Sequence, residues 1–464
     1  MTRIGFAYNQ KPAQADSHDA ADTESPYAEE EPPSKARDAL CGMRDAEQPR
    51  GRGPSLHEPV PHPVERIPHP EDEFAEWDSE DTIAAVERAL AGLGDVVRLE
   101  ANADFPEQLR STHPDIVFNM AEGLRGVNRE AHVPAICEFF GIPYSGSDPF
   151  TLSLCLDKAR TKECLTFHGV PTAAFAVVRS VEELRDAGCG MRAAERRKAE
   201  SRKQRAGTTS AERTLPPEPV ASRIPHPAQR IPHPWFIKPL HEGSSKGITE
   251  KNFCRTHDEL EAQVAELLER YQQPVLIETY LPGAEFTCAV LGNGRDARVL
   301  PIVGMNFSAL PDGALPVYGF EAKWLWDRPE RPLEIFECPA RIDEALRSRI
   351  ESVVLRAYHV LGCRDWSRID VRLDADGVPN VVEVNPLPGI LPNPEDNSCF
   401  PKAARAAGMS YDQLIQACVR IAAERQGVSL LETASRVHAV RPGSTAYMSS
   451  STRPEDPRAA ALLS

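Results

Sequence analysis

The sequence predicts an α/β fold that becomes α+β in its C-terminal half. The first observation is that short apolar runs alternate with amphipathic stretches, as strands alternate with helices. The second is a hairpin pattern near the C-terminus, where Val371, Leu373, Val382 and Val384 alternate with polar residues around the turn sequence Asp374-Ala-Asp-Gly. A chain of 464 residues is long enough for two or three domains.

The predicted elements follow each other along the chain. Residues 1–8 form a first strand, and a helix over residues 80–90 carries Ile83, Val86, Leu90 and Leu93 on one stripe. Further strands are predicted over residues 115–119 and 235–239. Further helices are predicted over residues 133–140, 180–185, 256–271 and 347–361.

The polar face of the hairpin carries candidate metal ligands. Glu383 and Asn385 are two residues apart in a strand, so their side chains share a face. If Asp370 lies on the neighbouring strand, three oxygen donors converge, which suits Mg²⁺ held between protein and nucleotide phosphates. Arg368 shares the face of Asp370 and could stabilise a developing oxyanion. A solvated hairpin with charged outer positions would give the same pattern. Other segments of the chain are therefore needed to choose between a metal site and a solvent-exposed hairpin.

Composition excludes several classes of function. The net charge of −16 argues against a nucleic-acid or anionic membrane partner. No run approaches the roughly 20 apolar residues that span a bilayer, and the first eight residues are too short and too polar for a signal peptide. The 11 cysteines form no Cys-x-x-Cys pair, which argues against a zinc site or a disulfide framework. We therefore expect a soluble cytoplasmic enzyme.

Two proline-rich stretches repeat each other and read as insertions. Residues 38–47 are echoed by residues 186–195, and the pentapeptide Arg-Ile-Pro-His-Pro begins at Arg66, Arg223 and Arg230. Its histidine could suggest a metal-binding tract, but one histidine per unit cannot fill a coordination sphere. We expect disordered insertions at about residues 16–72 and 187–234 and a disordered tail over residues 427–464.

A strand that ends in Lys238 leads into the loop Glu242-Gly-Ser-Ser-Lys-Gly247. Glycine and serine let backbone N–H groups approach phosphate oxygens, and Lys238 supplies a positive charge. The lysine precedes the glycines, so this is not a Walker A loop. The segment resembles the phosphate-covering loop of the ATP-grasp ligases.

The resemblance narrows to the D-alanine–D-alanine ligase family. The matching segments are residues 115–119, 141–147, 156–158, 161–162, 169–172, 235–247, 275–287 and 407–411. They occur in the family's order and cover roughly residues 80–185 and 235–426. The family implies an N-terminal doubly wound domain (residues 1–155), followed by central (156–285) and C-terminal (286–426) ATP-grasp subdomains that hold ATP between them.

The resemblance also implies roles for individual residues. ATP phosphates would contact Lys158, Lys238, Gly243 and Ser245; adenine would contact Glu278, Tyr280 and Leu281; and the ribose would contact Glu285. Mg²⁺, with Mn²⁺ as a possible substitute, would bind Asp370, Glu383 and Asn385, and catalysis would use Arg368, Ser244, Lys323 and the Gly389 N–H. Lys158 could instead be a surface helix lysine, and Tyr280 and Leu281 could be plain core residues.

Departures from the family surround the amino-acid pockets. The family's Gly-Gly-x-Ser-x-Glu segment, whose glutamate holds the first ammonium group, is not found after the first strand. Glu122 or Glu130 could replace that glutamate, or they could be helix-start residues favoured by the dipole. Trp324 stands where the family has a tyrosine, and Ser398 would bind the carboxylate of the second substrate.

We therefore expect an ATP-dependent carboxylate–amine ligase that acts through an acyl phosphate, with two D-alanines as possible substrates for a peptidoglycan precursor. A ligase of the same mechanism for another amino acid or peptide is the first alternative, and a catalytically idle nucleotide-binding regulator is the second. The intact Arg368, Asp370, Glu383 and Asn385 set argues against an idle protein. The partners would be small amino-acid substrates, with a homodimer as a possible assembly.

Overall fold

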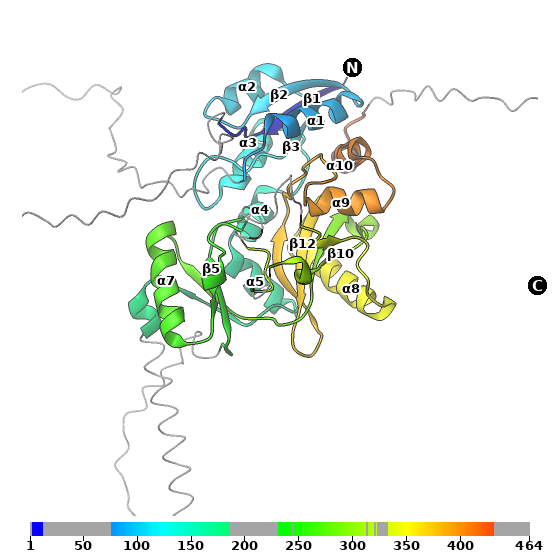
Figure 1. The fold of residues 1–464 in the computed structure, drawn as a ribbon. Helices are drawn as coiled ribbons and strands as arrows, with labels where there is room; N and C mark the ends of the chain where they lie inside the picture. Colours follow the sequence, from blue (N-terminus) through cyan, green and yellow to red (C-terminus); the bar gives the residue numbers. More distant parts are fainter. Residues whose placement is uncertain are drawn as a thin grey trace, which may run out of the picture. The chain divides into compact units, whose positions relative to one another are not determined.

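The computed structural model describes residues 2–12, 76–185, 231–243, 245–311, 314–319, 322 and 333–430. Three sheets organise this part of the chain (Figure 1). No helix within it is long and apolar enough to cross a membrane.

The N-terminal sheet is parallel and has helices on both faces. Its order is β2-β1-β3, with β1 at Arg3–Tyr8, β2 at Asp95–Glu100 and β3 at Ile116–Asn119. Ile4 and Phe6 of β1 pack with α1 (Glu80–Ala91) and α10 (Tyr411–Gln426), whereas Ala7 packs with α2 (Phe105–Thr112) and α3 (His132–Phe140). This two-sided cover confirms the doubly wound prediction.

Helix α1 forms where the apolar stripe predicted it. The Ser79 side chain accepts a hydrogen bond from the Thr82 N–H, so it caps a helix that would otherwise begin with unpaired donors. The stripe residues Ile83, Val86 and Leu90 are buried against β1 and α10. The C-terminal helix therefore closes one face of the N-terminal sheet.

Two consecutive helices lead from the N-terminal sheet to the central one. Helix α4 spans Pro149–Leu156 and α5 spans Lys158–Phe167, and the η1 turn (Arg129–Ala131) packs against α4. Asp157 separates the two helices, and its carboxylate accepts hydrogen bonds from the N–H groups of Ala159 and Arg160. This cap fixes Lys158 in the first turn of α5.

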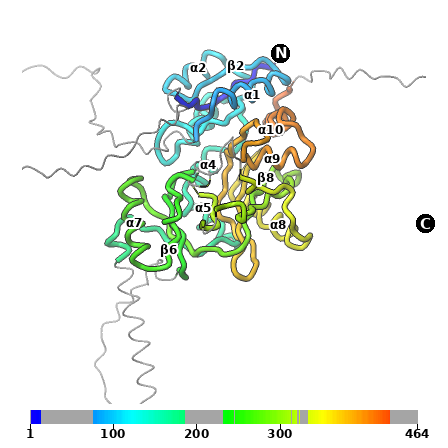
Figure 2. The backbone as a smooth tube through the Cα atoms, in the orientation of Figure 1, coloured from blue at the N-terminus to red at the C-terminus, as the bar shows by residue number. Residues whose placement is uncertain are grey.

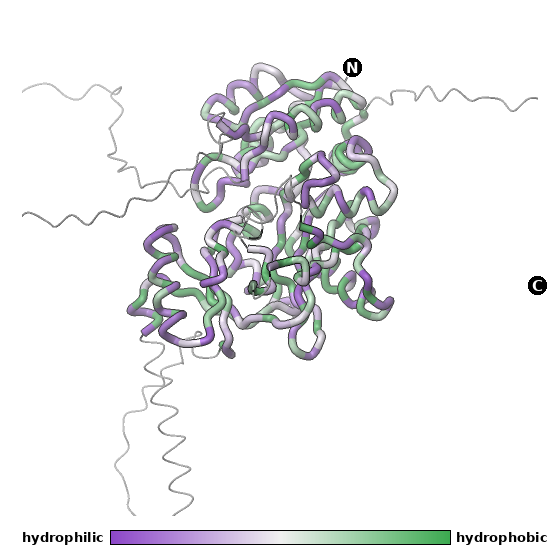
Figure 3. The backbone as a smooth tube through the Cα atoms, in the orientation of Figure 1, coloured by the Kyte–Doolittle hydropathy of each residue, from purple (hydrophilic) through white to green (hydrophobic). Residues whose placement is uncertain are grey.

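The central sheet is antiparallel, in the order β4-β7-β5-β6. Its strands are β4 (Phe175–Val178), β5 (Trp235–Pro239), β6 (Phe253–Cys254, after the η3 turn Glu250–Asn252) and β7 (Val275–Thr279). Helix α7 (His257–Tyr271) covers one face with Leu260, Val264 and Leu267, and its sequence alternates between hydrophilic and hydrophobic residues (Figure 3). Residues of α5 pack on the opposite face.

The C-terminal sheet carries the predicted hairpin. Its order is β11-β10-β8-β12-β13, with β9 also paired to β8. The strands are β8 (Glu285–Leu291), β9 (Arg298–Val299), β10 (Val303–Met305), β11 (Phe336–Glu337), β12 (Trp366–Leu373) and β13 (Pro379–Asn385). The short turns η4 (Gly294–Asp296) and η5 (Phe307–Ala309) lie in the connections between these strands. Helix α8 (Glu344–Val360) covers one face, and α9 (Cys399–Ala406) follows the hairpin, which is orange in Figure 2.

The predicted insertions and tail lie mostly outside the described residues. The structure corrects two of their boundaries: the end of the second insertion and the start of the tail. Ile231, placed in the second insertion, is buried in the core beneath α7, and its carbonyl accepts a hydrogen bond from the Trp235 indole. Gly427 caps α10, and the Val428 N–H donates to the Ala423 carbonyl. The ordered fold therefore includes residues 231–234 and 427–430, because their apolar side chains and backbone groups have partners in it.

Candidate functional site

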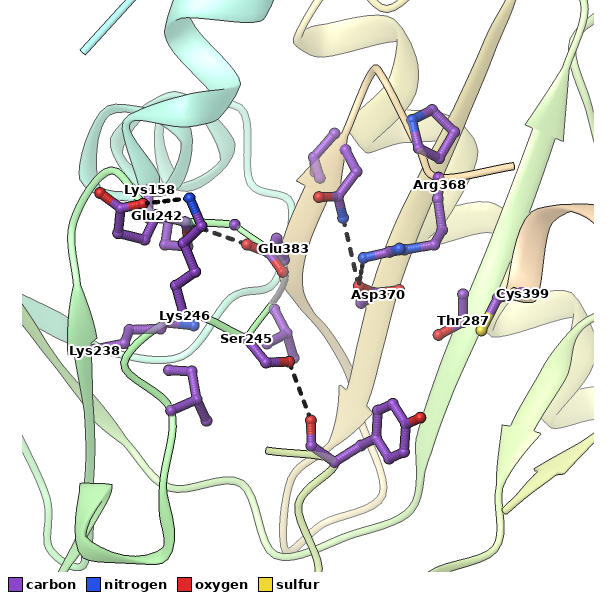
Figure 4. A pocket seen from close by; sticks show the side chains of 18 of the residues that line it. Lys158, Lys238, Glu242, Ser245, Lys246, Thr287, Arg368, Asp370, Glu383 and Cys399 are labelled. Carbon is purple, nitrogen blue, oxygen red and sulfur yellow. Dashed lines mark hydrogen bonds and ion pairs between the residues drawn. The ribbon is translucent and has the colours of Figure 1, made fainter. Parts of the chain in front are cut away.

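One cavity of about 420 Å³ is lined by side chains of the central and C-terminal sheets and by loop residues of the N-terminal domain. Figure 4 shows part of this lining. Among the residues proposed from the sequence, those that line it are Glu122, Glu130, Lys158, Lys238, Gly243, Ser245, Glu278, Tyr280, Leu281, Glu285, Arg368, Asp370, Glu383, Asn385, Gly389 and Ser398. Ser244, Lys323 and Trp324 lie outside the described residues. Segments far apart in the sequence thus meet at one site whose volume suits a small-molecule ligand.

The hairpin brings the candidate metal ligands together as predicted. Asp370 pairs with Glu383 across the β12–β13 ladder, and Arg368 pairs with Asn385. Arg368 Nη2 donates to Asp370 Oδ2 over 3.0 Å, and Asn385 Nδ2 lies 3.5 Å from the same oxygen. Burial raises the pKa of Asp370, and the Arg368 charge opposes that rise.

These residues fit a divalent metal that is shared with a ligand. Asp370 Oδ1 is buried and makes no hydrogen bond within the described part of the chain. In that same part, no group of three or more histidine, cysteine, aspartate or glutamate side chains could hold a metal. Two carboxylates and an amide are an incomplete protein shell, as expected when phosphate oxygens supply further ligands to Mg²⁺.

Three buried lysines surround two of the carboxylates. Lys158 Nζ lies 3.1 Å from Glu383 Oε1 and also donates to the Glu242 carbonyl. Lys238 Nζ and Lys162 Nζ lie 2.7 and 2.5 Å from the two oxygens of Glu278. Burial alone would raise the pKa of Glu278, but the two lysine charges lower it to about 2.

Lys162 is a site neighbour to which the sequence argument gave no role. It follows Lys158 by four residues on α5, so the two side chains lie on the same face of the helix. That spacing was a usable signal, because a residue four positions from Lys158 lies beside it on the helix, and Lys162 there contacts the cavity residue Glu278.

Glu76 is a carboxylate of the cavity that was not among the candidates proposed from the sequence, where Glu122 or Glu130 was expected to replace the family's N-terminal glutamate. It lines the cavity just before α1, with its side chain only 6% exposed. Arg129 Nη2 lies 3.1 Å and Lys246 Nζ lies 3.0 Å from its Oε2. Burial would raise the pKa of Glu76, but the charges of Arg129 and Lys246 bring it below its ordinary value. The sequence Glu76-Trp-Asp-Ser79 directly before a predicted helix was the available signal, and the long insertion concealed it.

The same glutamate holds the loop over residues 242–247, which was expected from the sequence to cover the phosphates. The Gly243 N–H donates to Glu76 Oε1 over 3.0 Å, and a Cβ at position 243 would lie 2.6 Å from that oxygen. A larger residue here would force the end of the Glu76 side chain to move. The next described residue, Ser245, has a φ of 61°, and its hydroxyl donates to the Tyr318 carbonyl over 3.3 Å. In this arrangement the Glu76 carboxylate occupies the Gly243 N–H and so fixes this end of the loop.

Glu122 and Glu130 line the cavity with Glu76. Burial raises the pKa of both, and that of Glu130 reaches about 7. The second cause of each rise is a neighbouring carboxylate, Glu130 for Glu122 and Glu76 for Glu130. Glu130 also lies in the η1 turn, so it occupies a helix-start position as well as facing the cavity.

Ser398 and Gly389 border the cavity from the loop before α9. The Ser398 hydroxyl donates to the Gly389 carbonyl over 3.2 Å and accepts from the Leu391 N–H over 3.1 Å. A Cβ at position 389 would meet no atom within 4 Å. The serine thus shapes the loop that carries Gly389.

The matching family model, described as D-ala D-ala ligase C-terminus, covers residues 218–420. An uncharacterised protein, y4sG, of Sinorhizobium fredii is 30% identical over 69% of this chain and 78% of its own length. A D-alanine–D-alanine ligase of Bordetella petrii is 33% identical over 67% of this chain and 76% of its own length. The chain belongs to the D-alanine–D-alanine ligase family.

Membership in the D-alanine–D-alanine ligase family makes the chain an ATP-grasp ligase that forms a carbon–nitrogen bond. A solved D-alanine–D-alanine ligase of Bacillus anthracis shares its fold, with a TM-score of 0.55 and 19% identity over 92% of this chain and 99% of the other. The expected combination of a doubly wound domain and an ATP-grasp fold is therefore confirmed.

Proposed function

We propose that this ligase joins the carboxylate of one amino acid to the amine of another through an acyl phosphate, with D-alanine the first candidate for both. The observation that carries the proposal is the Asp370–Glu383 pair, which lies in one cavity with Arg368, Lys158 and Lys238. The D-alanine–D-alanine ligase of Bordetella petrii supports the choice of substrate.

The site's own residues suit both halves of that reaction. A carboxylate is a poor acyl donor until it is phosphorylated, and Lys158 and Lys238 would neutralise the phosphoryl oxygens while that happens. The second amine then attacks the acyl carbon, and Arg368 with the Gly389 N–H would stabilise the oxyanion that forms. Asp370, Glu383 and Asn385 would hold Mg²⁺ or Mn²⁺, which when bound would offset phosphate charge.

The acidic end of the cavity would receive the first amino acid. A substrate ammonium cannot be buried without an anionic or hydrogen-bonding partner. Glu76 would take the part of the family's N-terminal glutamate, and Glu122 and Glu130 add further carboxylates beside it. These additional acids favour the second candidate function, a ligase of the same mechanism for an amino acid other than D-alanine. A cytoplasmic location, a homodimer and the three-domain division of the chain remain predictions.

A substrate panel tests the proposal. Purified protein with ATP, Mg²⁺ and single amino acids of both configurations should release phosphate, and we expect D-alanine to give the fastest release. Release with another amino acid alone would favour the second candidate function. No release with any amino acid or dipeptide would contradict the ligase proposal and leave a nucleotide-binding regulator.

We expect Glu122→Gln and Glu130→Gln to raise the KM of the amino-acid substrate far more than the KM of ATP. An ammonium bound beside these carboxylates would oppose the rise in their pKa values and favour their charged forms. Loss of a charged partner in a desolvated pocket typically costs about 2–5 kcal/mol, or roughly thirtyfold and more in affinity. Steady-state kinetics with each substrate varied in turn measures both constants. Glu107→Gln, on the exposed surface of α2, is the matched control and should change neither constant. If both variants keep the wild-type KM for the amino acid, the ammonium is held elsewhere. Glu76→Gln would then be the next variant to measure.

A further inference from the structure

Strand β12 carries a third charged residue on the face that bears Arg368 and Asp370. Side chains two apart in a strand share a face, so Arg372 continues this row toward the end of the cavity where Tyr280 and Glu285 lie. Arg372 pairs with Glu285 in the β12–β8 ladder. One strand therefore links the candidate metal site to the candidate ribose site.

Arg372 is almost fully buried and binds both residues assigned to the nucleoside. Its Nη1 donates to Glu285 Oε2 over 2.6 Å. Its Nη2 donates to the Tyr280 hydroxyl over 2.8 Å and to the Pro316 carbonyl over 2.9 Å. The guanidinium carbon lies 4.9 Å from the centre of the Tyr280 ring and 5.3 Å from that of Phe307. Its planar fork thus joins three separate segments around the cavity.

These contacts fix the orientation of Glu285. The carboxylate is held through Oε2, and Oε1 makes no hydrogen bond to another described residue. Burial raises the pKa of Glu285, and the Arg372 charge opposes that rise, so Arg372 favours the charged carboxylate. A charged, oriented carboxylate oxygen is a strong acceptor for the two hydroxyls of a ribose.

Arg372 also has a donor without a partner. Its Nε–H is buried and makes no hydrogen bond within the described part of the chain, although the residue lines the cavity. Buried donors are rarely left unpaired in folded proteins. An acceptor on a bound nucleoside would satisfy it.

We propose that Arg372 is a positioning residue that sets the nucleotide specificity of the ligase, by holding Glu285 and Tyr280 so that the site selects ribonucleotides over 2′-deoxyribonucleotides. The inference rests on the proposed ATP site, and it adds a residue and a selectivity to that site.

The test compares Arg372→Met, Arg372→Lys and Glu285→Gln with the unmodified chain. Equilibrium binding of ATP and 2′-deoxyATP is measured by calorimetry, and KM and kcat are measured for both nucleotides. We expect the unmodified chain to bind ATP about tenfold or more tightly than 2′-deoxyATP, as one lost hydrogen bond to a charged group predicts. Each variant should weaken ATP binding by about the same factor and bring the ratio of the two affinities close to one. The loss should appear in the KM of the nucleotide far more than in kcat or in the KM of the amino acid. Arg349→Met, an exposed change on α8, is the control.

The outcomes separate this inference from the function on which it rests. If the unmodified chain binds no ATP, the proposed function fails. If it prefers ATP but Arg372→Met and Arg372→Lys keep the same preference, only the role of Arg372 fails. Should Arg372→Met not fold, Arg372→Lys decides, because it keeps the charge and loses the fork: retained discrimination would overturn the proposal, and lost discrimination would support it.

Discussion

Glu383→Ala should lower turnover by at least about 100-fold while the fold stays intact. Glu383 faces Asp370 across the hairpin and lies 3.1 Å from Lys158, so its loss removes a candidate metal ligand and the ion-pair partner of a candidate phosphate-binding lysine. Mutation of a residue that only hydrogen-bonds to a metal ligand typically lowers metal affinity or activity by roughly 10–100-fold, so mutation of a ligand itself should lower turnover more. Phosphate release at saturating Mg²⁺ is the measurement, with circular dichroism as the check on folding.

Two further variants sharpen this prediction. Glu383→Gln keeps the size and hydrogen bonding of the side chain, so an equal loss would show that the negative charge is what matters. Asp376→Ala removes an exposed carboxylate from the tip of the same hairpin and should leave turnover unchanged. Near-normal turnover of Glu383→Ala would contradict the proposal that Glu383 is a metal ligand.

Glu278→Gln should destabilise the protein even without nucleotide. Its carboxylate bridges the ammonium groups of Lys162 and Lys238, all three being buried. Removing one partner from a buried ion pair typically costs about 3–5 kcal/mol, because the remaining charges are left uncompensated. We expect the Tm to fall by roughly 5 °C or more. The control is Glu163→Gln, which breaks an exposed ion pair with Arg160 on α5, the helix that carries Lys162. It should change the Tm by much less.

The pH dependence of this effect has a definite sign. The pKa of Glu278 in the folded protein is about 2, below its ordinary value of 4.5. A lowered carboxylate pKa gives stability that is fully present above the ordinary pKa and is lost as the pH falls toward the folded one. The difference in Tm between the unmodified chain and Glu278→Gln should therefore be constant from pH 6 to 8 and shrink below about pH 4.5. A difference that does not depend on pH would mean that lost packing, and not lost charge, causes the destabilisation.

Local periodicity was enough to predict the hairpin and the principal helices. The alternation around Asp370 and Glu383 has the period of a strand, and a short turn fixes which residues of the two strands face each other. The apolar stripe of α1 likewise has a single period that matches a helix. In both cases the backbone hydrogen bonds that form the element join residues that are close in sequence.

The remaining parts of the site depend on contacts that no local pattern specifies. Glu285 and Arg372 meet because β8 and β12 pair in one register, although 87 positions separate them. Glu76 is separated from the first strand by the long insertion, so its place after that strand could not be seen in the sequence. Ile231 belongs to the third copy of a repeated pentapeptide, and composition alone cannot show that this copy packs in the core.

The transfer of oxygen from the substrate to phosphate tests the central claim most directly. The amino acid that the panel selects, labelled with ¹⁸O in its carboxylate, is incubated with the ligase, ATP and Mg²⁺. A carboxylate oxygen that attacks the γ-phosphorus expels ADP, and attack of the amine on the acyl carbon then releases phosphate that keeps this oxygen. We predict one ¹⁸O in the inorganic phosphate for each dipeptide formed. Unlabelled phosphate, or ¹⁸O in AMP with release of pyrophosphate, would contradict the acyl-phosphate mechanism.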